Sequence, residues 1–190
     1  MAVSSVTFRQ FNIPATIVSI GIPKISIDKS VSDFCKTFEL PDEKTNHARF
    51  DEQKVVQIVE IKENALNSVT EMLKTVNDEK NVTAGLFLIN RMIDSGVKGV
   101  EKKYHIISRF NYSDSPNIQV MLAGIYRKTQ VPDAFGPLMT MFMKNAKNPK
   151  TSPFDPNEEV GGAILDYLRN KNAVMNYKQF SENLSKGLYS

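Results

Sequence analysis

The sequence predicts an α+β fold, in which a β-rich N-terminal segment of short antiparallel strands and one helix (residues 1–62) packs with a larger helical region (residues 63–190). Runs of β-branched residues dominate the first third, whereas apolar residues recur with a period of about 3.6 from Asn64 onward. Strands followed by helices are typical of α+β proteins. About 60 residues alone would make a marginal core, so we expect the chain to form a single domain.

The predicted strands are four short runs bordered by turn residues or proline. They are Val3–Phe8, Thr16–Ile22, Lys24–Ile27 and Lys54–Ile61. One helix is expected between the last two, because Val31, Phe34, Cys35 and Phe38 recur on one helical face. Cys35 then lies on the buried face, where we expect a small core residue and not a nucleophile.

The helical region begins with an apolar stripe from Leu66 to Val76, followed by a nearly all-apolar helix, capped by Asn81, that we expect to be central. The remaining expected helices are a surface helix around 100–107 and helices around 118–130, 135–143, 157–168 and 177–184. Lysine, proline and asparagine are dense at residues 144–156, which predicts an exposed loop.

The residues that most enzyme classes require in fixed patterns are missing from the sequence. Neither of the common glycine-rich phosphate-binding motifs occurs, and one cysteine with two histidines, His47 and His105, cannot form the usual zinc site. We therefore predict no catalytic residue, no metal, no cofactor and no small-molecule substrate. An enzyme whose site carries no recognisable motif stays open as a less favoured alternative.

Positive charge is concentrated in residues 98–150, which hold nine basic and three acidic residues in a chain of net charge +3. Aromatic residues lie among these cations, a mixture that suits single-stranded nucleic acid, since cations neutralise phosphates and exposed rings stack on bases. Cations on several helices can also simply solvate the surface. The predicted nucleic-acid-binding residues are Lys98, Lys102, Lys103, Arg109, Arg127, Lys128, Lys144, Lys147 and Lys150.

A continuous apolar run from Phe135 to Met143 is either deeply buried or a contact surface for another molecule. As a surface it would bind a protein partner or a second copy through Leu138, Met139, Phe142 and Met143. It could also enter an anionic membrane surface, with lysines of the following loop meeting lipid head groups.

These observations together favour a non-enzymatic structural protein that self-associates into a homo-oligomer and binds RNA or another polyanion through its basic central block. A viral packaging protein of nucleocapsid or matrix type fits this profile. The alternatives are a protein-binding adaptor that uses the 135–143 surface, or a scaffold at a membrane surface. A single cysteine, with no secretory signal and no long apolar stretch, predicts a cytoplasmic location.

Overall fold

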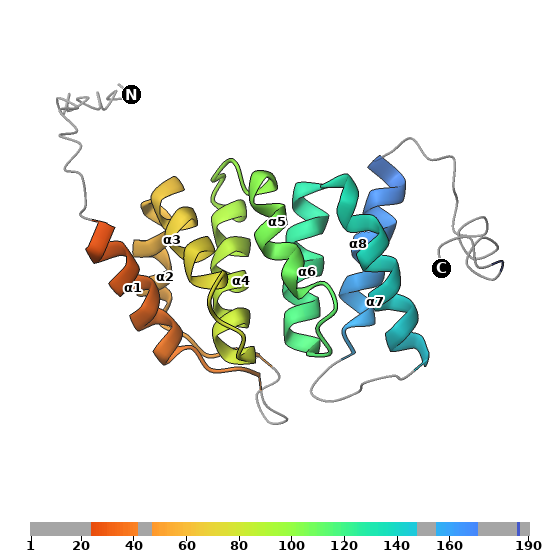
Figure 1. Ribbon diagram of the computed structural model, residues 1–190, viewed down its shortest axis with the longest axis horizontal. Coiled ribbons are helices and arrows are strands. Elements are labelled where there is room, and N and C mark those ends of the chain that lie inside the picture. Colours follow the sequence, from red (N-terminus) through yellow and green to blue (C-terminus); the bar gives the residue numbers. More distant parts are fainter. Residues whose placement is uncertain (1–23, 42–46, 148–154, 171–185, 187–190) are drawn as a thin grey trace, which may run out of the picture.

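A computed structural model describes residues 24–41, 47–147, 155–170 and 186 of the chain. Within these residues, eight α-helices and three short 3₁₀ helices follow one another along the long axis of the molecule (Figure 1). They are α1 (Lys24–Thr37), α2 (Glu52–Glu60), α3 (Glu63–Leu73), α4 (Glu79–Asp94), η1 (Glu101–Lys103), α5 (Tyr104–Ile107), η2 (Ser108–Phe110), α6 (Pro116–Thr129), η3 (Pro132–Ala134), α7 (Phe135–Lys147) and α8 (Asn157–Asn170).

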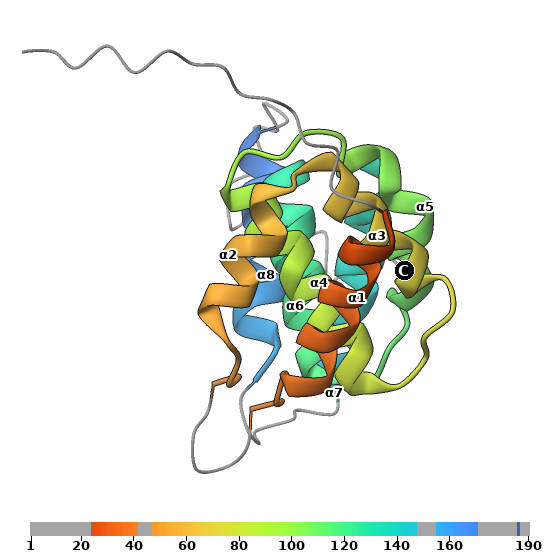
Figure 2. The same cartoon turned by 90° about the vertical axis from the view of Figure 1, so that its left-hand side faces the viewer.

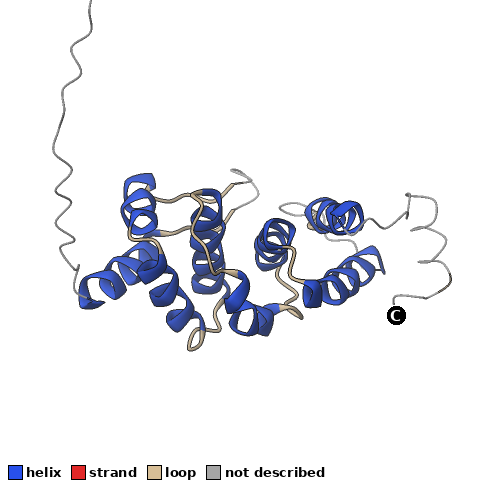
Figure 3. Ribbon diagram, turned by 90° about the horizontal axis from the view of Figure 1, so that it is seen from above, coloured by secondary structure: helices blue, strands red, loops and turns tan. Residues whose placement is uncertain are grey.

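The predicted α+β class is wrong, because the described residues are helical and form no sheet (Figure 3). The β-structure among them is one isolated antiparallel bridge between Glu39 and Arg49. The predicted strands Lys24–Ile27 and Lys54–Ile61 lie in or next to α1 and α2, while Val3–Phe8 and Thr16–Ile22 fall outside the described residues.

At α2 the helical periodicity of the buried residues outweighs the β-branched composition that predicts a strand. Val55, Ile58 and Val59 are buried at the spacing of one helical face, whereas Val56 between them is 45% exposed. The Asp51 side chain accepts hydrogen bonds from the backbone amides of Gln53 and Lys54, which caps the helix. A capped helix with one buried face tolerates β-branched residues despite their modest helix propensity.

Helix α1 starts earlier than the sequence predicts. Ile27 is buried and precedes Val31 by four residues, so it extends the predicted apolar face by one turn. The predicted helix through Val31 and Phe38 is otherwise present, and Cys35 is 3% exposed as expected. Burial raises the pKa of the Cys35 thiol to about 11, which leaves it protonated at neutral pH.

Helix α4 is central, as its apolar composition predicts, and contacts α1, α2 and α3 on one side and α6 on the other (Figures 1 and 2). Its N-cap is Asp78, and not Asn81 as predicted. One hydrophobic cluster runs from Val31 in α1 to Leu168 in α8, with α6 joining α4 to α8 and α7 packed on α8.

The structure differs from two other predictions in the second half of the chain. The surface helix expected around 100–107 is divided among η1, α5 and η2, and the expected exposed loop begins later than residue 144, because α7 continues to Lys147. Residues 148–154 and the expected helix at 177–184 lie outside the described residues. The expected helices at 118–130 and 157–168 are present as α6 and α8.

Candidate functional site

The basic segment, residues 98–112, connects α4 to α6 as a series of short helical turns. It leaves α4 through Gly96 and Gly99, which have φ angles of 78° and 87° that L side chains rarely adopt. Val100, Ile106, Ile107 and Phe110 anchor the segment because their side chains are buried in the core. Its polar side chains are thus held at the surface by a fixed backbone.

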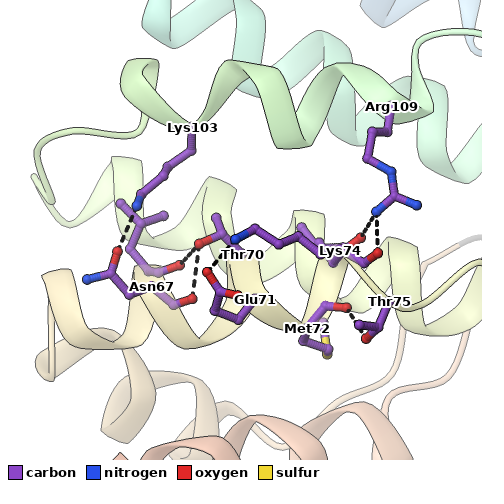
Figure 4. A network of polar contacts seen from close by, with 10 residues as sticks. Asn67, Thr70, Glu71, Met72, Lys74, Thr75, Lys103 and Arg109 are labelled. Carbon is purple, nitrogen blue, oxygen red and sulfur yellow. Dashed lines mark hydrogen bonds and ion pairs between the residues drawn. The ribbon is translucent and has the colours of Figure 1, made fainter.

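Two cations of the basic segment reach across to α3 (Figure 4). Lys103 Nζ donates a hydrogen bond to Asn67 Oδ1 at 2.8 Å. Arg109 Nη1 donates to the carbonyl oxygens of Leu73 at 2.9 Å and Lys74 at 2.6 Å. These carbonyls lie where α3 ends and lack a partner in the helix, so Arg109 caps the C-terminus of α3 with a positive charge.

Two lysines of the basic segment have amino groups without a partner among the described residues. Lys98 and Lys102 are exposed, and no described residue forms an ion pair or hydrogen bond with either amino group. At the far end of the segment, the Tyr112 side chain is 77% exposed. The segment therefore presents two free cations and one free aromatic ring, with Lys103 and Arg109 between them in sequence.

The predicted cations outside this segment mostly form ion pairs that join helices. Arg127 of α6 pairs with Asp166 of α8, and its Nη1 lies 4.0 Å from Glu159 Oε2. Lys128 pairs with Asp94 at 2.7 Å and Lys144 with Asp114 at 2.5 Å. Lys147 is exposed at the end of α7, without a partner among the described residues, and Lys150 lies outside them.

The apolar run in α7 is mostly core, the first of the two alternatives that the sequence left open. Leu138 is 0% and Met139 is 1% exposed, so neither side chain can form a contact surface in the folded chain. Phe142 and Met143 are half-buried. A partner-binding role for these two residues stays a prediction.

A groove that the sequence did not predict lies between the first and second halves of the molecule, with a volume of about 580 Å³. Three rings line it, with centroids 4.5 Å apart for Phe50 and Phe87 and 5.7 Å apart for Phe38 and Phe87. The other lining residues are Pro41, His47, Ala48, Thr83, Asn117, Val120, Met121, Asp155, Glu158 and Glu159. We call it the acidic-aromatic groove.

No local signal in the sequence identifies this groove. Its rings come from the end of α1, the chain before α2, and α4, so only the tertiary structure brings them together. Glu158 and Glu159 had a sufficient explanation as charges in the first turn of α8, where they favour the helix dipole. Their second location, at the edge of an apolar groove, follows from the packing of α8 against α6.

A second cavity of about 550 Å³ lies between α1 and α3 and is lined by Cys35, Met72 and Ser68 among others. Cys35 Sγ lies 3.5 Å from Met72 Sδ, and Ser68 Oγ donates to Asp28 Oδ1 at 2.5 Å. A protonated thiol beside a thioether offers no activated nucleophile. Within the described part of the chain, no cluster of three or more histidine, cysteine, aspartate or glutamate residues could hold a metal ion.

Comparison of the chain with protein-family models, curated proteins and solved structures finds no match. Among the described helices, none is both long and apolar enough to cross a membrane. A functional assignment therefore rests on the residues of this chain, and on the basic segment and the acidic-aromatic groove in particular.

Proposed function

We propose that the protein is a non-enzymatic assembly protein, which self-associates and binds single-stranded RNA or a similar polyanion through its basic segment. One observation carries this proposal. Lys98 and Lys102, which form no ion pair or hydrogen bond with a described residue, lie on the same fixed segment as the exposed ring of Tyr112. Lysines neutralise phosphates and an exposed ring stacks on a base, so the segment has both components of a sequence-tolerant RNA contact.

Ion pairs within the protein reduce the number of cations that are free to bind RNA in the proposed surface. Arg127, Lys128 and Lys144 already face carboxylates, and a phosphate would have to compete with those carboxylates for each charge. Lys103 and Arg109 donate to oxygens of α3 and can still contribute positive potential to a ligand nearby. The proposed RNA contact is therefore centred on residues 98–112 and covers less than the whole basic block.

The proposal is tested by measuring binding of a fluorescent single-stranded RNA to the full chain by anisotropy. We expect Lys98→Gln combined with Lys102→Gln to weaken binding about tenfold at low salt, since each phosphate contact contributes to the salt-dependent affinity. The control is Lys29→Gln combined with Lys54→Gln, which removes the same charge from an exposed position in α1 and a partly buried position in α2. Equal losses in the two variants would indicate only a net-charge effect and would contradict the proposed site.

A further inference from the structure

The corner between α2 and α3 places a lysine in a backbone conformation that favours glycine. Helix α2 ends at Glu60 and α3 begins at Glu63, so two residues, Ile61 and Lys62, change the direction of the chain (Figure 2). Lys62 has φ 58° and ψ −122°, as at the first central position of a type II′ turn, where glycine dominates. The other non-glycine residue with positive φ in the described part of the chain, Gln130, has the ordinary left-handed helical conformation at the end of α6. The corner at Lys62 therefore holds backbone strain.

The sequence across this corner is typical of one continuous helix. If position 62 is included, buried apolar residues recur at alternating spacings of four and three along both helices; they are Val55, Val59, Leu66, Val69 and Leu73. Neither glycine nor proline occurs from Glu52 to Leu73, so the usual helix-breaking residues are missing. The Lys62 side chain forms no capping hydrogen bond at the start of α3. The local sequence thus favours a single helix from Glu52 to Leu73.

Packing within one copy keeps α2 at an angle to α3. Val55, Ile58 and Val59 are buried, and α2 contacts α1 and α4. Arg91 of α4 also forms an ion pair with Glu52 of α2. In a continuous helix, α2 would extend roughly 13 Å beyond the start of α3 and away from the α4 of its own copy. A lone chain can therefore relieve the corner only by exposing the apolar face of α2 to water.

We propose that α2 and α3 join into one helix when two copies of this chain associate, and that the copies exchange their α1–α2 units (residues 24–60). Each unit then packs on α3 and α4 of the other copy, where it meets the same side chains that it contacts in a single copy. The receiving surface is thus one that the unit already fits, and the local structure changes at Ile61 and Lys62. A short connection under strain favours such an exchange. The proposal rests on the self-association in the proposed function and names the elements that perform it.

Cross-linking between single cysteines tests the exchange directly. In a Cys35→Ala background, one chain carries Glu52→Cys in α2 and another carries Arg91→Cys in α4, at positions whose native side chains pair. The two variants are mixed, unfolded in urea, refolded together and treated with a short bismaleimide. We expect a covalent dimer on a denaturing gel that neither variant forms alone, because α2 of one chain then lies on α4 of the other.

The matched control joins two helices that are not exchanged. Arg127 of α6 pairs with Asp166 of α8, and both helices stay within their own copy in the proposed dimer. A mixture of Arg127→Cys and Asp166→Cys chains, treated in the same way, should give no covalent dimer. A covalent dimer of equal yield in both mixtures would indicate nonspecific cross-linking and would contradict the exchange.

Lys62→Gly tests the strain at the corner through the mass of the full chain, measured by light scattering over a concentration series. For the native sequence we expect the mass to rise from 21.4 kDa toward twice that value. Glycine relieves the bent corner and disfavours the continuous helix, so Lys62→Gly should raise the dissociation constant. We expect a rise of about a hundredfold, since each dimer straightens two corners and each contributes about tenfold. Lys62→Ala removes the same charge without relieving the strain and should keep the native association.

Gln130→Gly is the control for strain relief elsewhere, because this residue also has positive φ but lies outside the exchanged unit and its corner. It should leave the dissociation constant unchanged. A native chain that stays monomeric, or an unchanged dissociation constant in Lys62→Gly, would overturn the proposal. An associated chain without the cross-link between the Glu52→Cys and Arg91→Cys variants would also overturn it.

RNA binding separates this inference from the proposed function. The Lys62→Gly variant should bind single-stranded RNA through the basic segment as a monomer. If the native chain associates without exchange while RNA binding depends on Lys98 and Lys102, only the exchange proposal fails. If exchange occurs but no RNA binds, the RNA part of the proposed function fails and the exchange proposal holds.

Discussion

Arg109 is the cation of the basic segment for which a substitution can best distinguish a structural role from a ligand-binding role. Its Nη1 donates to the carbonyls of Leu73 at 2.9 Å and Lys74 at 2.6 Å, at the negative end of the α3 dipole. The guanidinium also lies 5.7 Å from the centroid of the Phe110 ring. A hydrogen bond to a charged group contributes roughly 1.5 to 3 kcal/mol when buried, and water competes at this exposed position.

We therefore expect Arg109→Ala to lower the free energy of unfolding by about 1.5 kcal/mol, which corresponds to a fall in Tm of roughly 4 °C for a chain of this size. Urea unfolding followed by circular dichroism measures it. Arg109→Lys keeps the charge but not the planar donor set, so it should lose part of the stability and retain most of the RNA affinity. An Arg109→Ala variant with native Tm and lost RNA binding would refute the capping role.

Three further predictions concern the fold. Hydrogen bonds from the backbone and side chain of Asn81 lower the pKa of Asp78 below 3.8, so this carboxylate stabilises α4 above that pH and the contribution is lost as pH falls through the folded pKa. Asp78→Ala should cost about 1 kcal/mol at pH 7 and progressively less as the pH is lowered through the acid range, by urea unfolding over a pH series; a cost that does not change with pH would contradict the cap. Met139→Asp should abolish cooperative thermal unfolding because it buries an unpaired charge, and a folded variant would show that the side chain is not core. Gly85→Ala should lower Tm, because the added Cβ would lie 2.8 Å from Met72 Cε and 2.9 Å from Leu73 Cδ2; an unchanged Tm would show that both side chains shift freely.

Apolar periodicity predicts the helices of the second half of the chain better than residue type does. The buried character of α4 and the positions of α6 and α8 follow from it. The same periodicity is present at α2, where Val55, Ile58 and Val59 share a face, although the β-branched composition of this segment predicts a strand. Composition favours a strand only weakly, and a capped amphipathic helix packed on α1 and α4 overrides that preference.

The candidate sites were less accessible to sequence reasoning, because their roles depend on partners distant in the chain. The number of charges could not show that Lys144 pairs with Asp114 and Arg127 with Asp166, whereas Lys98 and Lys102 form no ion pair with a described carboxylate. The acidic-aromatic groove combines the end of α1 with residues of α4, α6 and α8. Only the packing of α6 between α4 and α8 brings these elements together.

Our main conclusion is that Lys98 and Lys102 are available to bind RNA, whereas Lys128 and Lys144 are held in ion pairs. The salt dependence of RNA binding tests this conclusion most directly. Each phosphate contact to a single strand contributes roughly 0.7 to the slope of log affinity against log salt concentration. Lys98→Ala combined with Lys102→Ala should reduce this slope by about 1.4, whereas Lys128→Ala combined with Lys144→Ala, which removes the same charge from ion-paired positions, should leave it unchanged. A slope that falls equally in both double variants, or in neither, would contradict the account.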